Sequence, residues 1–308
     1  MIRILTIFIL LTYLTFQGCK KSAQEYFELG RSEASASNDS AAVLAFTKAI
    51  ELNPSFIEAY ERRAMSRAFL NDERGAIEDY NTIIKLQPNS YDAYISRGNF
   101  NTIRGFYNEA IDDYTKSIEM DPKKWDAYLR RASRYVALRE NMAAIDDCRE
   151  VIIKGGDLAH AYQIMGLAYL RMNDYKNALY HYTLSIEKDS SSSESFSNRG
   201  LCKYRLNDYY GAISDCTKAI KLDSNKIVSF ITRADSFREL TNYEKAIADM
   251  DVALKIDNKL AEGFYSRGEL NMLAGNFEKG CLDLSRSYEL GYKDALSYIR
   301  KYCQALNK

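Results

Sequence analysis

Apolar residues recur along most of the chain with a constant period, and each period contains two short stripes. In one period, the first stripe runs from Tyr91 to Gly98 and the second from Tyr107 to Ile118, with Gly105 between them. Apolar positions three and four residues apart are typical of one face of an amphipathic helix. A glycine between two such stripes marks a turn. The pattern therefore predicts pairs of helices joined by tight turns.

Three series of positions keep this period without an insertion. The small residues of the second helices are Ala42, Ala76, Ala110, Ala144, Ala178, Ala212, Ala246 and Gly280. The small residues of the first helices are Gly30, Ala64, Gly98, Ala132, Gly166, Gly200, Ala234 and Gly268. The aromatic series is Tyr26, Tyr60, Tyr94, Tyr128, Tyr162, Phe196, Phe230 and Phe264. The repeating units are therefore 23–56, 57–90, 91–124, 125–158, 159–192, 193–226, 227–260 and 261–294.

Residues just before the first helices have side chains suited to capping. Ser55, Asn89, Ser191 and Asn225 are expected to be N-caps, because their side chains can accept a hydrogen bond from the first helical turn. Proline cannot continue a helix, so Pro122 and its two equivalents close the second helices of the first three units.

The repeat spacing of about 34 residues, the paired small residues and the closing prolines together resemble the tetratricopeptide repeat family. The resemblance covers Ala23 to Asp294. It implies an all-α fold, a right-handed α-α superhelix (solenoid) of eight helix-turn-helix repeats, with the first helices on a concave face. Residues 295–308 are expected to form a C-terminal capping helix, amphipathic from Ala295 to Tyr302, because a stack of repeats needs a polar end.

Six units carry an arginine in the first helix, and the same six carry an aspartate in the second helix. The first and fifth units lack both residues. This coincidence predicts an ion pair within each helical hairpin, because pairing between neighbouring units would leave Asp147 and Arg199 unmatched. We interpret the pairs as structural. They are Arg63 with Asp79, Arg97 with Asp113, Arg131 with Asp147, Arg199 with Asp215, Arg233 with Asp249, and Arg267 with Asp283.

The cysteines fall into two groups. Cys148 and Cys216 occupy a repeat position that faces the core, so they are expected to be buried. Cys281 and Cys303 are equally distant from a predicted turn at Tyr292, which would place them at the same height in an antiparallel hairpin. We expect a disulfide between them in an exported chain. Cys202 with Cys216 is a weaker candidate pair by the same argument.

The first residues differ from the repeats. One arginine precedes an apolar run of about 13 residues, which is shorter than the roughly 20 that span a membrane and typical of an export signal. Gly18-Cys19 after this run resembles a bacterial lipoprotein signal, which implies cleavage after residue 18 and a lipid on Cys19. Residues 1–18 would then be the signal peptide and 19–22 the lipid-attachment site and linker. An ordinary cleaved signal or an uncleaved short anchor remains the alternative. The expected location is the bacterial cell envelope, lipid-anchored at the outer membrane or the periplasmic face of the inner membrane.

Composition and charge narrow the possible functions. The 42 basic and 42 acidic residues give zero net charge, which argues against a non-specific nucleic-acid binder. We find no phosphate-binding glycine loop, nucleophile elbow or Cys–His metal motif. The two histidines, His160 and His181, both lie in the fifth unit without an evident third metal ligand. The sequence therefore predicts no enzyme activity, no cofactor and no small-molecule substrate.

The fifth unit is the most irregular. It lacks the ion pair, and Gly155-Gly156 and Ser190 to Ser193 replace proline at its two ends. These joints are either tolerated drift or a flexible centre that adjusts to a ligand; the sequence leaves both open.

The resemblance implies that non-core residues of the first helices line a binding groove. For the third to sixth units these candidates are Ile95, Asn99, Leu129, Arg130, Ser133, Ile164, Leu167, Leu170, Arg171, Asn198, Leu201 and Arg205. The stripe is apolar with arginines beside it. We do not find the family's set of Lys, Asn and Arg that clamps an acidic C-terminus.

The leading hypothesis is a non-enzymatic, envelope-anchored scaffold that binds a protein or peptide segment in the concave groove. The alternative is a structural subunit of an envelope assembly complex that docks through convex or end surfaces.

Overall fold

The computed structural model describes residues 21–303, and within this range the chain forms seventeen α-helices, one π-helical turn and no β-strand. The predicted signal peptide and Cys19 lie outside the described residues. Between residues 21 and 303, none of the helices combines the length and apolar character needed to span a bilayer.

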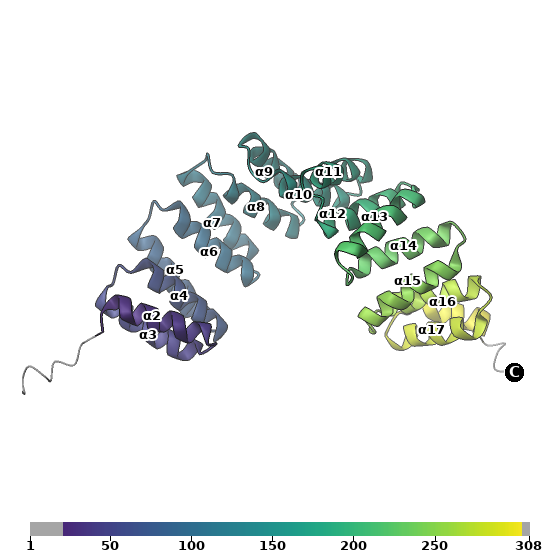
Figure 1. Ribbon diagram of the computed structural model, residues 1–308, viewed down its shortest axis with the longest axis horizontal. Helices are drawn as coiled ribbons and strands as arrows, with labels where there is room; N and C mark the ends of the chain where they lie inside the picture. The colour runs from purple at the N-terminus through teal and green to yellow at the C-terminus, as the bar shows by residue number, and fades with distance from the viewer. Residues whose placement is uncertain (1–20, 304–308) are drawn as a thin grey trace, which may run out of the picture. The chain divides into compact units, whose positions relative to one another are not determined.

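Each predicted repeat folds as two antiparallel helices that pack against each other (Figure 1). The first helices are α2 (Ala23–Ser35), α4 (Ile57–Phe69), α6 (Tyr91–Ile103), α8 (Asp126–Ala137), α10 (Leu158–Arg171), α12 (Ser193–Arg205), α14 (Ile227–Glu239) and α16 (Ala261–Leu273). The second helices are α3 (Asp39–Leu52), α5 (Glu73–Leu86), α7 (Tyr107–Met120), α9 (Asn141–Ile153), α11 (Tyr175–Lys188), α13 (Tyr209–Leu222), α15 (Tyr243–Ile256) and α17 (Phe277–Glu289). The fold is an all-α repeat solenoid, as the constant period of the sequence predicted.

Contacts between helices divide the chain into two compact units, with the boundary after Lys123. The first unit contains α2 to α7, and the second contains α8 to the last described residue. The boundary therefore falls between the third and fourth repeats, where the last of the three prolines stands at Pro122. We describe each unit by itself.

The small residues let the two helices of a repeat approach closely. A methyl group at Gly98 would lie 2.7 Å from the ring of Tyr114, and one at Gly166 would lie 2.9 Å from the ring of Tyr182. Both tyrosines are fully buried. The aromatic ring of the second helix thus fills the space that the missing side chain leaves, which gives the hairpin its close packing.

The turn between the two helices has the same backbone conformation in every repeat. One residue per turn has a positive φ, at Ser37, Asn71, Gly105, Arg139, Asn173, Asn207, Thr241 and Gly275. The next amide then donates to a carbonyl five residues earlier, for example Asp72 N to Arg67 O at 2.8 Å. This is the helix ending that glycine and asparagine favour. The repeat is therefore defined at its turn as well as in its core.

The N-caps of the first helices lie one residue later than predicted. Ser90 and Ser192 accept hydrogen bonds from the amides of Ala93 and Ser195, so the expectation for Asn89 and Ser191 was wrong by one position. Phe56 and Lys226 occupy the same place without a side-chain cap, so Ser55 and Asn225 are not caps. The amide of an expected residue instead bonds to a side chain two residues earlier, as in Ser191 N to Asp189 Oδ1 at 2.8 Å. Because this turn already holds the chain, the helix begins after it.

The C-terminal segment is helical, but only its first four residues are α-helical. It consists of α18 (Ala295–Tyr298) followed directly by the π-helical turn η1 (Ile299–Cys303), so a helical segment forms where one was predicted from Ala295 to Tyr302. A segment this short gains little from helix propagation, so its contacts with α17 determine its course. Cys303 is buried and is joined to Cys281 of α17 by a disulfide, with the two Cα atoms 5.6 Å apart. The segment thus covers the end of the last repeat.

The three other cysteines of the described chain carry free thiols. Cys148, Cys202 and Cys216 are each fully buried. The weaker expectation of a Cys202–Cys216 disulfide was therefore wrong. Burial raises the pKa of the Cys202 and Cys216 thiols to about 12. These cysteines serve as small core residues.

Candidate functional site

All six predicted arginine–aspartate pairs form, each between the two helices of one hairpin. The closest nitrogen–oxygen distances are 2.6 Å for Arg63–Asp79, 2.6 Å for Arg97–Asp113, 2.7 Å for Arg131–Asp147, 2.8 Å for Arg199–Asp215, 2.6 Å for Arg233–Asp249 and 2.6 Å for Arg267–Asp283. All six aspartates are buried. Burial raises the pKa of Asp113 and Asp147 against the opposing effect of their arginines. Buried carboxylates of this kind require a cation, so each pair holds its two helices in register.

Several of these arginines also bond to the preceding repeat, a contact that the sequence analysis missed. Arg63 donates from Nη1 to Thr47 Oγ1 at 3.0 Å, and Arg233 donates in the same way to Thr217 at 2.9 Å. In each case the acceptor stands 16 residues before the arginine, and the aspartate stands 16 residues after it. A polar residue recurring at that earlier position is the signal that could have revealed the contact. One guanidinium therefore connects two consecutive repeats.

A residue four places after the arginine supplies a further donor to the carboxylate in several repeats. Arg67 Nη1 lies 2.9 Å from Asp79, and Lys203 Nζ lies 2.8 Å from Asp215. Phe237 occupies this place in the seventh repeat, and its side chain has no donor to offer. The aspartates consequently differ in how many partners they retain if the arginine is lost.

The fifth repeat replaces the ion pair with Met165 and His181. Met165 is buried, and the His181 ring stacks on Tyr169 with the ring centres 5.2 Å apart and the planes 2° apart. His181 Nδ1 is buried without a hydrogen-bond partner in the described chain, and burial lowers the pKa of this histidine. His160 is exposed and bonds to Asp157 in its own helix turn. No group of His, Cys, Asp or Glu between residues 21 and 303 is arranged to hold a metal ion.

The twelve groove candidates do not form one set. Ile95 and Asn99 belong to the unit that ends at Lys123, and the other ten belong to the following unit. Ile95 is only 9% exposed, so it belongs to the core and its assignment to a groove was wrong. Asn99 Oδ1 accepts a hydrogen bond from the Tyr114 hydroxyl at 3.0 Å. Leu170 packs against a buried cluster with Tyr182.

The remaining candidates keep some exposed surface. Leu129, Ser133, Ile164, Leu167, Asn198 and Leu201 are half-buried, and Arg130, Arg171 and Arg205 are exposed. Arg171 donates to the Val136 carbonyl oxygen of the preceding repeat. The stripe is therefore less apolar at its surface than the sequence suggested.

A cavity of about 240 Å³ lies on the first helices α12, α14 and α16 in the second unit. Two groove candidates, Leu201 and Arg205, line it. Ile231 and Val228 of α14 add apolar wall, and Asp235 is a carboxylate within it. We call this cavity the first-helix cavity.

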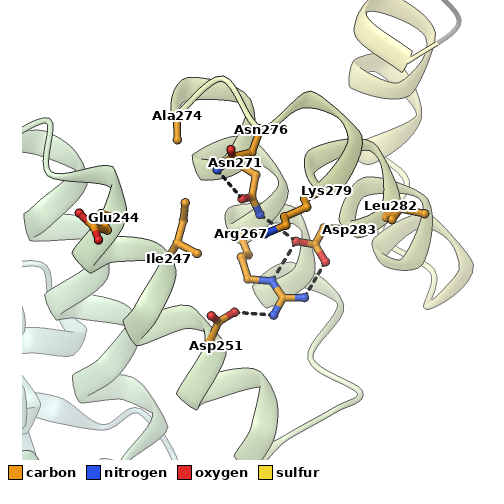
Figure 2. A pocket seen from close by; sticks show the side chains of 10 residues that line it. All are labelled: Glu244, Ile247, Asp251, Arg267, Asn271, Ala274, Asn276, Lys279, Leu282 and Asp283. Carbon is orange, nitrogen blue, oxygen red and sulfur yellow. Dashed lines mark hydrogen bonds and ion pairs between the residues drawn. The ribbon is translucent and has the colours of Figure 1, made fainter. Parts of the chain in front are cut away.

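A second cavity, of about 470 Å³, lies between α15, α16 and α17. Figure 2 shows the Arg267 guanidinium between Asp283 of its own hairpin and Asp251 of the preceding helix pair. The dashed lines also join Asn271 to Asp283. A smaller cavity occupies the equivalent place around Arg97 and Asp113 in the third repeat. In both cavities the ion pair and its asparagine bond to one another.

A third surface hollow, of about 650 Å³, lies on α2 and α4 in the first unit. Arg31 and Arg62 stand beside Met65 and Phe69, and the Phe69 side chain is 72% exposed. The sequence analysis did not include these residues, because its groove list began at the third repeat.

A tetratricopeptide repeat model matches residues 193–226, which form the sixth repeat, α12 and α13. Solved tetratricopeptide repeat structures superpose on the chain. The chain has the fold of a tetratricopeptide repeat protein. Each of the solved chains described below shares less than a fifth of its residues with this one, so the likeness concerns the fold.

Three solved structures illustrate the similarity. YrrB, a TPR protein with an unusual peptide-binding site, has a TM-score of 0.51 and 19% identity, over 61% of this chain and 97% of YrrB. A tetratricopeptide repeat protein from Parabacteroides merdae has a TM-score of 0.53 and 18% identity, over 89% of this chain and 97% of that one. The APC/C hetero-tetramer Cut9-Hcn1 has a TM-score of 0.61 and 16% identity, over 92% of this chain and 57% of the other. No curated protein matches the sequence.

Proposed function

We propose that the chain is a non-enzymatic scaffold that binds a protein, or a peptide segment of one, on the surface of its first helices. The first-helix cavity carries this proposal, because it is lined by three consecutive first helices and combines apolar wall with a few polar groups. Binding sites for peptides share these features. The peptide-binding site named for YrrB is consistent with the same use of this fold.

The experiment is site-specific photocrosslinking in the native cell envelope. A benzoylphenylalanine replaces Val228, which lines the cavity and is 46% exposed, and Lys218, an exposed residue of α13, serves as the control position. We expect one protein adduct at residue 228 and none at residue 218. The adduct should disappear when Leu201→Lys is added, because Leu201 lines the cavity and is only half-buried, so a long cationic side chain there would fill the cavity. Equal adducts at both positions would exclude the cavity as the binding site.

The second candidate function is a structural subunit of an envelope assembly that docks through its convex or end surfaces. One observation on the last repeat supports this second function: Phe277 and Leu282 on α17 are 52% and 66% exposed. Exposed apolar residues close to the end of a repeat stack are suited to contact with another protein. Benzoylphenylalanine at residue 282 distinguishes the two functions, since only this alternative predicts an adduct there.

We also propose that Cys19 carries a lipid that anchors the scaffold to the envelope. The support comes from the sequence: a short apolar run followed by Gly18-Cys19. Mass spectrometry of the mature N-terminus tests it. An unmodified Cys19, or cleavage at another bond, would exclude the lipid.

A further inference from the structure

Two carboxylates line the first-helix cavity, Asp235 and Glu262; residues 21–303 donate a hydrogen bond to neither, and Asp235 is the more buried of the two. Asp235 of α14 lies in the cavity wall, and its side chain is 28% exposed. Its ion pair is with Arg238, at the long distance of 4.0 Å, and that arginine also bonds to Glu239 at 3.2 Å. Burial raises the pKa of Asp235. A carboxylate that is partly removed from water is stabilised when a cation binds to it.

Part of the wall beside Asp235 is apolar. Leu201, Val228, Ile231 and the buried Met250 line the cavity, together with polar residues such as Thr232. Such a surface accommodates the aliphatic stem of a lysine or arginine, whose charged end then reaches a polar group. The volume of about 240 Å³ is below the roughly 300–1,000 Å³ of sites for small molecules, so the cavity suits a single side chain.

The charged residues around the cavity favour a positively charged side chain as its ligand. Glu262 lines the cavity together with Asp235, while the cation that lines it is Arg205. Arg205 is exposed and lies over the Tyr204 ring at 5.9 Å. The charges of Arg238 and Arg205 act to lower the pKa of Asp235, but the larger effect of burial still raises it. An anionic side chain in the cavity would meet two carboxylates, one of them partly buried. A cationic side chain would meet Asp235 directly.

We infer that the first-helix cavity is a specificity pocket for a lysine or arginine side chain of the bound segment, with its stem against Leu201 and Ile231 and its charge on Asp235. This inference rests on the proposed function, because it assumes that a protein segment binds the first helices. It names the chemistry of that segment: at least one long cationic side chain at an otherwise apolar contact.

The test uses the purified full chain in mild detergent and a phage library of random 12-residue peptides. We expect the wild-type chain to enrich peptides that share a lysine or arginine, and Asp235→Asn to lose this enrichment. Glu278→Gln is the control, since Glu278 is an exposed residue of α17 outside the cavity. Asp235→Asn should remain folded by circular dichroism, because no hydrogen bond among residues 21–303 depends on this carboxylate.

The best enriched peptide then gives a direct measurement by fluorescence anisotropy. Replacing its lysine or arginine by leucine, or Asp235 by asparagine, should each weaken binding at least about 10-fold, and the two changes together should weaken it no further. Enriched peptides without a common cation, or binding unchanged by Asp235→Asn, would overturn the inference while leaving peptide binding intact. Enrichment of acidic peptides would overturn it as well. If no peptide is enriched, both the inference and the proposed function fail.

Discussion

Replacing Arg233 by methionine should reveal how strongly the repeat depends on its buried ion pair. Asp249 is 6% exposed, and the hydrogen bonds that the described chain gives its carboxylate come from Arg233, at 2.8 Å from Nε and 2.6 Å from Nη2. Methionine is a suitable replacement, because Met165 occupies the same place in the fifth repeat. The variant therefore leaves a buried carboxylate without a partner.

Breaking a buried ion pair by removing one partner costs about 3–5 kcal/mol of unfolding free energy. Arg63→Met is the matched control, because Arg67 Nη1 remains 2.9 Å from Asp79 and keeps that carboxylate paired. The control should cost about 1.5–3 kcal/mol, the range for lost hydrogen bonds to a charged group. Both variants also lose one bond to a threonine of the preceding repeat, so that contribution is common to the two.

The assay is urea unfolding followed by circular dichroism, with hydrogen exchange of α14 and α15 to localise the effect, since repeat arrays can unfold in parts. Adding Asp249→Ala to Arg233→Met should restore stability to within about 1–2 kcal/mol of the wild type, because the unpaired charge is then gone. Alanine is already present at this place in the first repeat, at Ala45. Equal costs for Arg233→Met and Arg63→Met, or a double variant less stable than Arg233→Met, would refute the reasoning.

Three further predictions follow from other parts of the structure. Cys281→Ser with Cys303→Ser opens a closed loop of 22 residues and should lower the unfolding free energy of the last repeat by about 3 kcal/mol, seen as faster hydrogen exchange in α18; unchanged exchange would argue against a role for the disulfide. Thr241→Asn should stabilise the chain by about 0.5–1 kcal/mol in urea unfolding, because the β-branched residue has a φ of 57°, which asparagine tolerates better; a loss of stability would contradict this. Because burial lowers the pKa of His181 in the folded state, the unfolded chain binds its proton more tightly, so this residue should reduce stability as the pH falls below about 6.5. The difference in unfolding free energy between wild type and His181→Phe should change over this range, and a constant difference would disprove the effect.

The architecture could be predicted from the sequence because each repeat is specified by patterns of residues that are close together in the chain. The constant period, the two apolar stripes and the turn residues each predict the same helical hairpin, and all eight hairpins form. The arginine–aspartate arrangement could also be inferred, since two residues that are absent from the same two units must meet within a unit. Agreement between independent local signals made these predictions possible.

The binding surface could not be derived in the same way. Ile95 and Leu201 share the pattern of apolar first-helix residues, yet Ile95 is buried and Leu201 lines a cavity. Which face of a helix remains exposed to solvent depends on how the neighbouring helices pack. The repeat period of the sequence contains no information about this packing. The π-helical turn of the capping segment could not be derived for a related reason: a short helix follows its tertiary contacts more than its own propensity.

The sequence by itself thus determined the number of repeats, the helices, the turns and the partner of each buried aspartate. Only the tertiary structure showed that His181 Nδ1 is buried without a partner in the described chain and that Asp235 lies in the wall of a cavity. The physical reason is distance along the chain. A helix and its hairpin are set by residues within one period, whereas a cavity is formed by side chains from three helices whose distances only packing establishes.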